Sequence, residues 1–295
     1  MSCNLCEETD SNELFTKEYQ TVVFKVVKCP QCGLVYVKNP PVDETLKDLY
    51  GEEFFSTGQQ SISVNGGAVD FVEGARNDAI FKNAMRRFEE LKKYKAGGNL
   101  LDIGCGKGIF LKVAEAHFEG TGIDISEYAA KYGNEVLGVN IINGDLLDLE
   151  FSEEHFDVVT MWDFIVHVRN PIAYVQKANI LLKKGGILTV TTGDFGSLVA
   201  KIFGRNWHLM LPYMHLFYFS QRTITEMLEK SGFEVVSVGR PGKYVNISFL
   251  VSKMSRLYGL SFLQGLYNRL AGSGSFLKNV YLNLFDIMTV YARKQ

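Results

Sequence analysis

The chain has 295 residues, enough for one sizeable domain and a smaller appendage. Its formal net charge of −2 gives the whole molecule no attraction to nucleic acid, and no apolar run approaches the ~20 residues that span a bilayer. The polar, acidic start is unlike a signal or transit peptide, so we expect a cytoplasmic protein.

The first recognisable module is a pair of C-x-x-C motifs within residues 1–40. Cys3 and Cys6 form one pair, Cys29 and Cys32 the other, with twenty-two residues between the pairs. Without an export signal a disulfide framework is disfavoured, and this spacing is typical of a four-cysteine zinc ribbon. Four thiolates would leave a Zn²⁺ ion no open position, so we expect it to be structural and to supply folding energy that a short segment lacks.

The rest of the chain predicts a linker with one short helix at 41–70 and an α/β domain at 71–295. Its strands are mostly Val, Ile and Leu with little alternation, as expected for a parallel sheet covered by helices on both faces. We therefore predict a Rossmann-like, doubly wound fold. Strands are predicted at 99–103, 120–125, 139–144, 156–162, 186–192, 233–239 and 285–294, and helices at 71–94 and from residues 107, 126, 171 and 220.

A glycine loop follows the first predicted strand of this domain, in the stretch "LLDIGCGKG". In open α/β sheets ligands bind beyond the carboxyl ends of the strands, where bare backbone at Gly104, Gly106 and Gly108 would let a ligand approach. Asp124 ends the second predicted strand, where a carboxylate can accept hydrogen bonds from both ribose hydroxyls, and Asp145 follows the third strand, within reach of an adenine-sized group. The pattern predicts a nucleoside site at this edge.

The spacing of the glycines in this loop differs from that of a dinucleotide-binding site. The dinucleotide fingerprint is G-x-G-x-x-G, whereas the loop here reads G-x-G-x-G and follows Asp102. An acid beside the loop would repel a pyrophosphate and suit a cationic ammonium or sulfonium group. We therefore expect an aminoacyl nucleoside.

Five ordered blocks resemble class I S-adenosylmethionine-dependent methyltransferases: "LLDIGCGKG", "GIDIS", "NGDLLDL", "FDVVTMWDFIVHVRNP" and "LLKKGGILTVTT". The resemblance implies S-adenosylmethionine as cosubstrate and a seven-stranded sheet whose last strand is antiparallel and lies beside residues 233–239. It also implies the cofactor-binding residues, namely Arg76, Asp102, Gly104, Cys105, Gly106, Gly108, Asp124, Ile125, Asp145, Leu146 and Trp162. We interpret Cys105 as a packing residue of the loop and not as a nucleophile.

An insertion at about 193–219 follows the fifth predicted strand and should cover the methyl acceptor. It is rich in aromatic residues, which suit a lid that keeps an organic substrate dry. An oxygen acceptor needs a base, and a histidine is the natural one. We expect His215 of the insertion in this role, with His167 second. The alternative is that each histidine only holds a loop in place.

A second insertion at 241–284 is basic and amphipathic, with apolar residues near helical spacing. Such a helix can lie on an anionic membrane or face a phosphorylated substrate, and it can equally pack on the domain or form a self-association surface. A peripheral position at the inner membrane surface therefore stays open.

The expected acceptor is a small-molecule, sugar or glycan hydroxyl. The ribbon resembles those fused to small-molecule methyltransferases, and the further C-terminal domain usual in C-methylating members is not seen here, which favours O-methylation. Zinc ribbons often touch RNA, so an rRNA base methyltransferase is the main rival, although residues 1–40 are slightly acidic. DNA is disfavoured because "MWDF" replaces the Asn/Asp-Pro-Pro-Tyr signature. A non-catalytic binding protein with this fold is the third reading.

Overall fold

The computed structural model describes residues 2–42, 78–246 and 279–295. The predicted linker beyond residue 42, the first part of the 71–94 helix with Arg76, and the middle of the 241–284 insertion lie outside these residues. Among the described residues, no helix combines the length and apolar character needed to cross a membrane.

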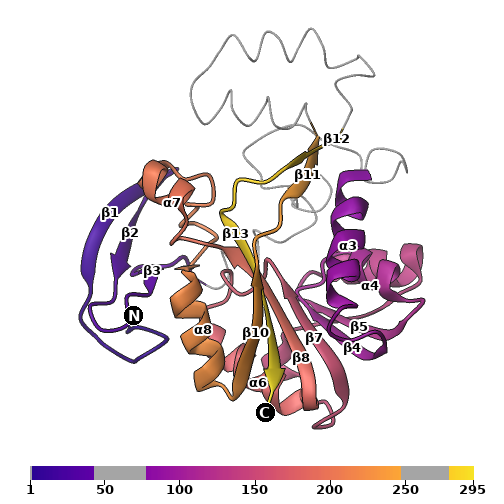
Figure 1. Ribbon diagram of the computed structural model, residues 1–295. Helices are drawn as coiled ribbons and strands as arrows, with labels where there is room; N and C mark the ends of the chain where they lie inside the picture. The colour runs from indigo at the N-terminus through magenta and orange to yellow at the C-terminus, as the bar shows by residue number, and fades with distance from the viewer. Residues whose placement is uncertain (1, 43–77, 247–278) are drawn as a thin grey trace, which may run out of the picture.

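A seven-stranded sheet forms the centre of the α/β domain (Figure 1). Its strands, in spatial order, are β10 (Phe233–Gly239), β13 (Ile287–Lys294), β8 (Leu182–Gly193), β7 (Phe156–Trp162), β4 (Gly98–Ile103), β5 (Phe118–Asp124) and β6 (Asn140–Asn143). Strands β8, β7, β4, β5 and β6 pair in parallel, and β13 is antiparallel to both neighbours. The predicted Rossmann-like fold is confirmed, including the antiparallel last strand beside β10.

Helices cover both faces of this sheet because each presents a buried apolar stripe to it. They are α3 (Asp78–Leu91), α4 (Ile109–Ala114) and α5 (Glu127–Tyr132) on one face, and α6 (Pro171–Leu181) and α8 (Gln221–Lys230) on the other. Helix α8 begins at a capping box between Ser220 and Thr223, as the polar start of its sequence predicts. Further turns are a π-helical turn at Gly133–Leu137 and 3-10 turns at Leu146–Asp148 and Gly204–Asn206.

The N-terminal segment forms a second, antiparallel sheet that lies next to α8 (Figure 1). Its strands are β1 (Asn12–Tyr19), β2 (Val22–Lys28), β3 (Val35–Val37) and β9 (Phe217–Tyr218). The fourth strand, β9, comes from the insertion at 193–219, which also contains helix α7 (Leu198–Phe203). The N-terminal segment and the insertion therefore share one sheet.

The second insertion does not begin and end as predicted. Strands β11 (Lys243–Asn246) and β12 (Asn279–Leu282) pair antiparallel at its two ends, where a helix was expected. The rings of Tyr244 and Tyr281 lie 5.4 Å apart across this pair. Aromatic and β-branched residues favour such cross-strand contacts, while the apolar residues at helical spacing lie outside the described residues.

Candidate functional site

The glycine loop joins β4 to α4 at the carboxyl edge of the sheet. Gly104, Gly106 and Gly108 have φ of 69°, 55° and 78°, a region that side chains rarely adopt. A Cβ at Gly104 would lie 2.3 Å from Cδ2 of Phe164, and one at Gly108 would lie 2.7 Å from Cγ2 of Val139. Glycine is thus required at these positions by the backbone conformation of the turn and, at Gly104 and Gly108, by close contacts with other side chains. These requirements hold whether or not a ligand is bound.

Asp124 ends β5 and faces this loop. One carboxylate oxygen accepts a hydrogen bond from the Gly106 amide at 2.8 Å, and the other accepts from the Ser126 amide at 2.9 Å. Burial raises the pKa of Asp124, and these two hydrogen bonds partly oppose the rise. Each oxygen keeps a lone pair, so the carboxylate can also accept from two neighbouring hydroxyl groups of a ribose.

Asp102 and Cys105 lie beneath the loop. The Asp102 side chain is 2% exposed, and the Thr160 hydroxyl donates to it at 2.6 Å. Burial raises the pKa of Asp102 to about 7, so near neutral pH it carries less negative charge than the sequence argument for a cationic ligand assumes. Burial likewise raises the pKa of Cys105 well above its ordinary value, and its sulfur packs close to Gly122. An inert packing thiol is the result.

The end of the crevice expected to hold adenine is formed by the turns after β5 and β6. Ile125 is 43% exposed and offers an apolar surface there. The Asp145 carboxylate accepts from the Leu147 amide at 2.9 Å and from the Tyr174 hydroxyl at 2.6 Å. Leu146 is 1% exposed and packs in the core, so it offers a ligand almost no surface.

Beyond β7 the structure gathers a charged cluster that sequence reasoning missed. Arg87 of α3 lies 5.0 Å from the Trp162 ring, and it pairs with Asp163 at 2.5 Å. Lys243 of β11 lies 3.1 Å from the same carboxylate oxygen. Although burial raises the pKa of Asp163, the two cations outweigh it and hold that pKa well below its ordinary value. The cluster carries two positive charges and one negative charge.

Trp162 itself is 8% exposed, and its indole N–H has no hydrogen-bond partner among the described residues. A buried unpaired donor is costly, and it is one indication that a ligand group belongs here. Arg87 lies in α3, the helix that precedes β4, whereas Arg76, the residue that the resemblance suggested, lies outside the described residues.

A cavity of about 130 Å³ adjoins this cluster. Its apolar walls come mainly from the first insertion, through Trp207, Leu209, Leu211, Met214 and Phe217, with Ile287 from β13. Its polar walls include Asp163, His167, Thr192, His215 and Lys243. Asp163 directly follows Trp162 in the chain, so this cavity lies next to the end of β7.

His215 and His167 lie together in this cavity, with ring centroids 4.9 Å apart. Nδ1 of His215 lies 2.8 Å from the Leu209 carbonyl, which as an acceptor fixes the proton on Nδ1 and leaves Nε2 as a free base. Burial, with His167 nearby, lowers the pKa of His215 to about 3. Burial also lowers the pKa of His167, whose ring is held by the Met214 and Asp163 carbonyls. The tautomer leaves Nε2 of His215 available to accept a proton, although the lowered pKa makes this ring a weaker base than an exposed histidine. That His215 acts as the base, with His167 second, stays a prediction.

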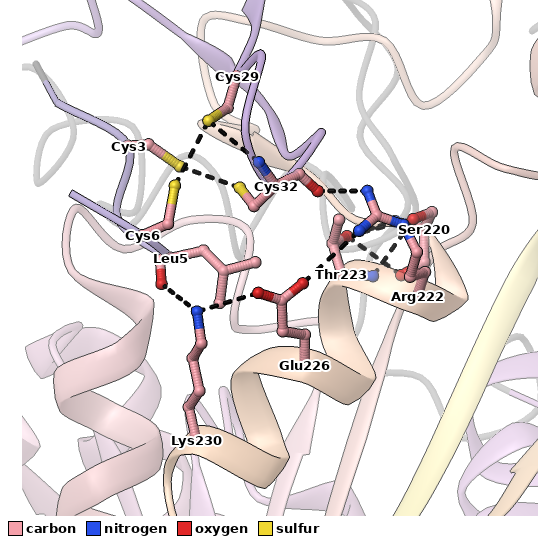
Figure 2. Close-up of polar contacts among 10 residues, drawn as sticks. All are labelled: Cys3, Leu5, Cys6, Cys29, Cys32, Ser220, Arg222, Thr223, Glu226 and Lys230. Atoms are coloured by element: carbon pink, nitrogen blue, oxygen red, sulfur yellow. Dashed lines mark hydrogen bonds and ion pairs between the residues drawn. The ribbon is translucent and has the colours of Figure 1, made fainter. Parts of the chain in front are cut away.

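The four N-terminal cysteines form a single cluster (Figure 2). Their sulfurs lie within 4.8 Å of one another, with Cys3–Cys32 and Cys6–Cys29 sulfur pairs at 3.4 Å. A tetrahedral Zn²⁺ with bonds of about 2.3 Å holds its four sulfurs at comparable separations. The Cys32 amide also donates to the Cys29 sulfur at 3.5 Å, as in a zinc knuckle. The donor set fits a closed structural zinc site.

The cluster is fixed to α8 (Figure 2). Lys230 donates to the Leu5 carbonyl at 3.3 Å and pairs with Glu226 at 2.9 Å. Arg222 donates to the Cys32 carbonyl and lies against Gly33, whose φ is 72°. The main-chain carbonyls of the cysteine loops are thus bound by side chains of α8.

Residues 74–238 match the family described as Methyltransferase domain, more than half of the chain. The chain belongs to this family. An uncharacterized protein of Methanocaldococcus jannaschii is 29% identical over 158 residues, which cover 54% of this chain and 74% of that protein. The ubiquinone biosynthesis O-methyltransferase of Actinobacillus pleuropneumoniae is 33% identical over 107 residues, 32% of this chain and 46% of that enzyme. The match thus spans less than half of that enzyme's length.

Solved structures show the same methyltransferase fold at low identity. The magnesium protoporphyrin IX methyltransferase of Synechocystis with bound S-adenosylhomocysteine aligns with a TM-score of 0.54 at 16% identity, covering 86% of this chain and all of that one. A [4+2]-cyclase aligns with a TM-score of 0.55 at 18% identity, covering 86% and 97%. The family makes the chain an S-adenosylmethionine-dependent methyltransferase, while the fold alone leaves the acceptor open.

Proposed function

We propose that this methyltransferase transfers a methyl group from S-adenosylmethionine to a hydroxyl of a small molecule. The main observation in support of this proposal is the cavity at the end of β7, which contains His215 with its proton fixed on Nδ1. A neutral imidazole of this tautomer can accept the hydroxyl proton at Nε2. Relatives named ubiquinone biosynthesis O-methyltransferases support oxygen as the acceptor atom.

The crevice residues fit the cosubstrate. Asp124 would hold the ribose, Ile125 and the Asp145 turn the adenine, and Arg87 with the Trp162 indole N–H the methionine carboxylate. When bound, S-adenosylmethionine supplies an activated methyl group on a sulfonium. The chain's own task is then to orient the acceptor, exclude water and remove one proton.

The cavity walls favour an acceptor whose buried part is apolar. Six of the lining side chains named above are aliphatic or aromatic, which suits a ring or similar flat group better than a fully hydroxylated one. We therefore favour a small apolar acceptor over a sugar or a glycan. The structural Zn²⁺ would be held by Cys3, Cys6, Cys29 and Cys32, which leave it no open position for this chemistry.

An RNA acceptor receives little support from the ribbon. Lys17 donates to the carbonyls of Arg205 and Met210, and Lys38 donates to the Thr9 carbonyl. These lysines are engaged within the protein, and no observation among the described residues gives the ribbon a positive surface.

The test combines binding with transfer. Titration calorimetry of the full chain with S-adenosylhomocysteine should show one binding site per chain. A panel of phenols, catechols and sugars, assayed with methyl-labelled cosubstrate, should yield a labelled ether from at least one hydroxyl. Failure to bind S-adenosylhomocysteine would contradict the proposal, and labelling of nitrogen or carbon alone would correct the acceptor atom.

A further inference from the structure

We propose that the zinc ribbon, residues 2–42, is a positioning element of the acceptor cavity because it holds the segment that carries His215. That this cavity binds the methyl acceptor depends on the proposed function above. The positioning itself rests on contacts between the ribbon and the first insertion, and it can be tested separately.

The first contact is a shared sheet. Strand β3 of the ribbon pairs antiparallel with β9 of the insertion, placing Val35 opposite Tyr218 and Tyr36 opposite Phe217. Phe217 and Tyr218 both line the cavity. One wall of the acceptor cavity is therefore an edge strand of the ribbon's sheet.

The second contact surrounds His215 directly. The Val37 amide of the ribbon donates to the Leu216 carbonyl at 2.9 Å, and the Leu216 amide donates to the Val166 carbonyl at 2.7 Å. On the other side of His215, the Met214 carbonyl lies 3.0 Å from Nδ1 of His167. A chain of hydrogen bonds thus runs from the ribbon, past His215, to the loop after β7.

The third contact comes from β1. Lys17 reaches across to the insertion, donating to the Met210 carbonyl at 2.6 Å and the Arg205 carbonyl at 3.1 Å. Two residues along the strand, the Tyr19 ring stacks on Tyr213 with centroids 3.8 Å apart. These groups fix the part of the insertion that precedes His215.

The ribbon can serve as a support because its other end is anchored. The cysteine loops are seated on α8 through Lys230 and Arg222, as Figure 2 shows. A segment of this size depends on its metal for much of its folding energy. Zinc at the cysteine cluster would therefore stabilise the acceptor cavity without contacting the acceptor.

The test replaces Lys17 with methionine in the full chain, which keeps most of the apolar stem and removes the two hydrogen bonds. Lys25→Met is the matched control, since that side chain is exposed on the neighbouring strand. Hydrogen exchange of residues 207–216 should be about tenfold faster in Lys17→Met than in wild type or the control. The Nδ1–H signal of His215 in ¹⁵N spectra should weaken, whereas zinc content and affinity for S-adenosylhomocysteine should stay the same.

Unchanged exchange at 207–216 and an unchanged His215 signal in zinc-loaded Lys17→Met would overturn the proposal. So would faster exchange that extends equally to β4 and β5, because that indicates general destabilisation. If Lys17→Met does not fold, Tyr19→Leu probes the same support through the ring stack and should give the same local pattern. Absence of S-adenosylhomocysteine binding by the wild type would refute the proposed function and leave the exchange result standing.

Discussion

The proposed cofactor crevice and the proposed acceptor cavity are built in different ways. Most of the crevice is assembled from the turns that directly follow β4, β5, β6 and β7, with Arg87 added from α3. The cavity is assembled from the first insertion, β13 and β11, and it is supported by the N-terminal ribbon. Cofactor binding and acceptor binding should therefore respond to different mutations.

Among the variants that test this difference between crevice and cavity, His215→Ala is expected to have the largest effect. Removing the base should lower kcat by about 10²- to 10⁴-fold with a hydroxyl acceptor. Affinity for S-adenosylhomocysteine should not change, because His215 lies in the cavity and not in the crevice. The exposed His155 is the matched control, and His155→Ala should retain full turnover. Unaltered kcat in His215→Ala would remove this residue from the mechanism.

Asp124→Ala tests the other side of the comparison. Loss of two charge-assisted hydrogen bonds to the ribose should raise the Kd for S-adenosylhomocysteine by about 100-fold or more. The exposed Glu150 gives a control of similar charge, and Glu150→Ala should bind normally. Calorimetry measures both variants. Equal affinities would mean that the ribose is not held at the end of β5.

Gly104→Ala tests how strongly the folded state requires glycine in the loop after β4. The positive φ and the predicted contact with Phe164 should together lower the free energy of unfolding by about 1–3 kcal/mol. Gly185 has φ of 76° and no atom within 4 Å of an added Cβ, so Gly185→Ala isolates the backbone cost. Urea unfolding should show the larger loss for Gly104→Ala. A smaller loss there than at Gly185 would contradict the packing argument.

The smallest expected effect is on the pH dependence of stability, and it comes from His215 in the cavity. His215 faces His167, Asp163 and Lys243, and its pKa of about 3 is below the ordinary value of 6.5. Between these values the unfolded chain binds a proton that the folded chain does not, so this residue makes stability fall as pH decreases from 7.5 to 5. His215→Asn should flatten that dependence in thermal unfolding. An unchanged slope would show that His215 is not buried as a neutral ring.

The same contrast explains what the sequence could predict. The loop glycines, Asp124 and the alternation of strands and helices follow from patterns local to a strand and its following turn, and the four cysteines are recognisable by spacing alone. The antiparallel last strand beside β10 was predicted from the family resemblance. Arg87, Lys243 and the pairing of β3 with β9 were missed because they depend on which distant segments meet. The clue to β9 was the run of three aromatic residues at 217–219, which favours a strand but does not identify its partner.

Asp102 shows a different limit. Its position before the glycine loop was correctly noticed, but its burial and its hydrogen bond to Thr160 are properties of the packed sheet. A carboxyl group whose charge depends on its surroundings cannot be assigned from sequence as a fixed negative charge.

The central claim is that crevice and cavity form one methyl-transfer site. A crystal structure of the full chain with S-adenosylhomocysteine tests it most directly. The account predicts ribose hydroxyls on Asp124 and the sulfur directed past Trp162 toward the cavity that contains His215. A nucleoside bound elsewhere, or a sulfur that faces away from that cavity, would contradict the account.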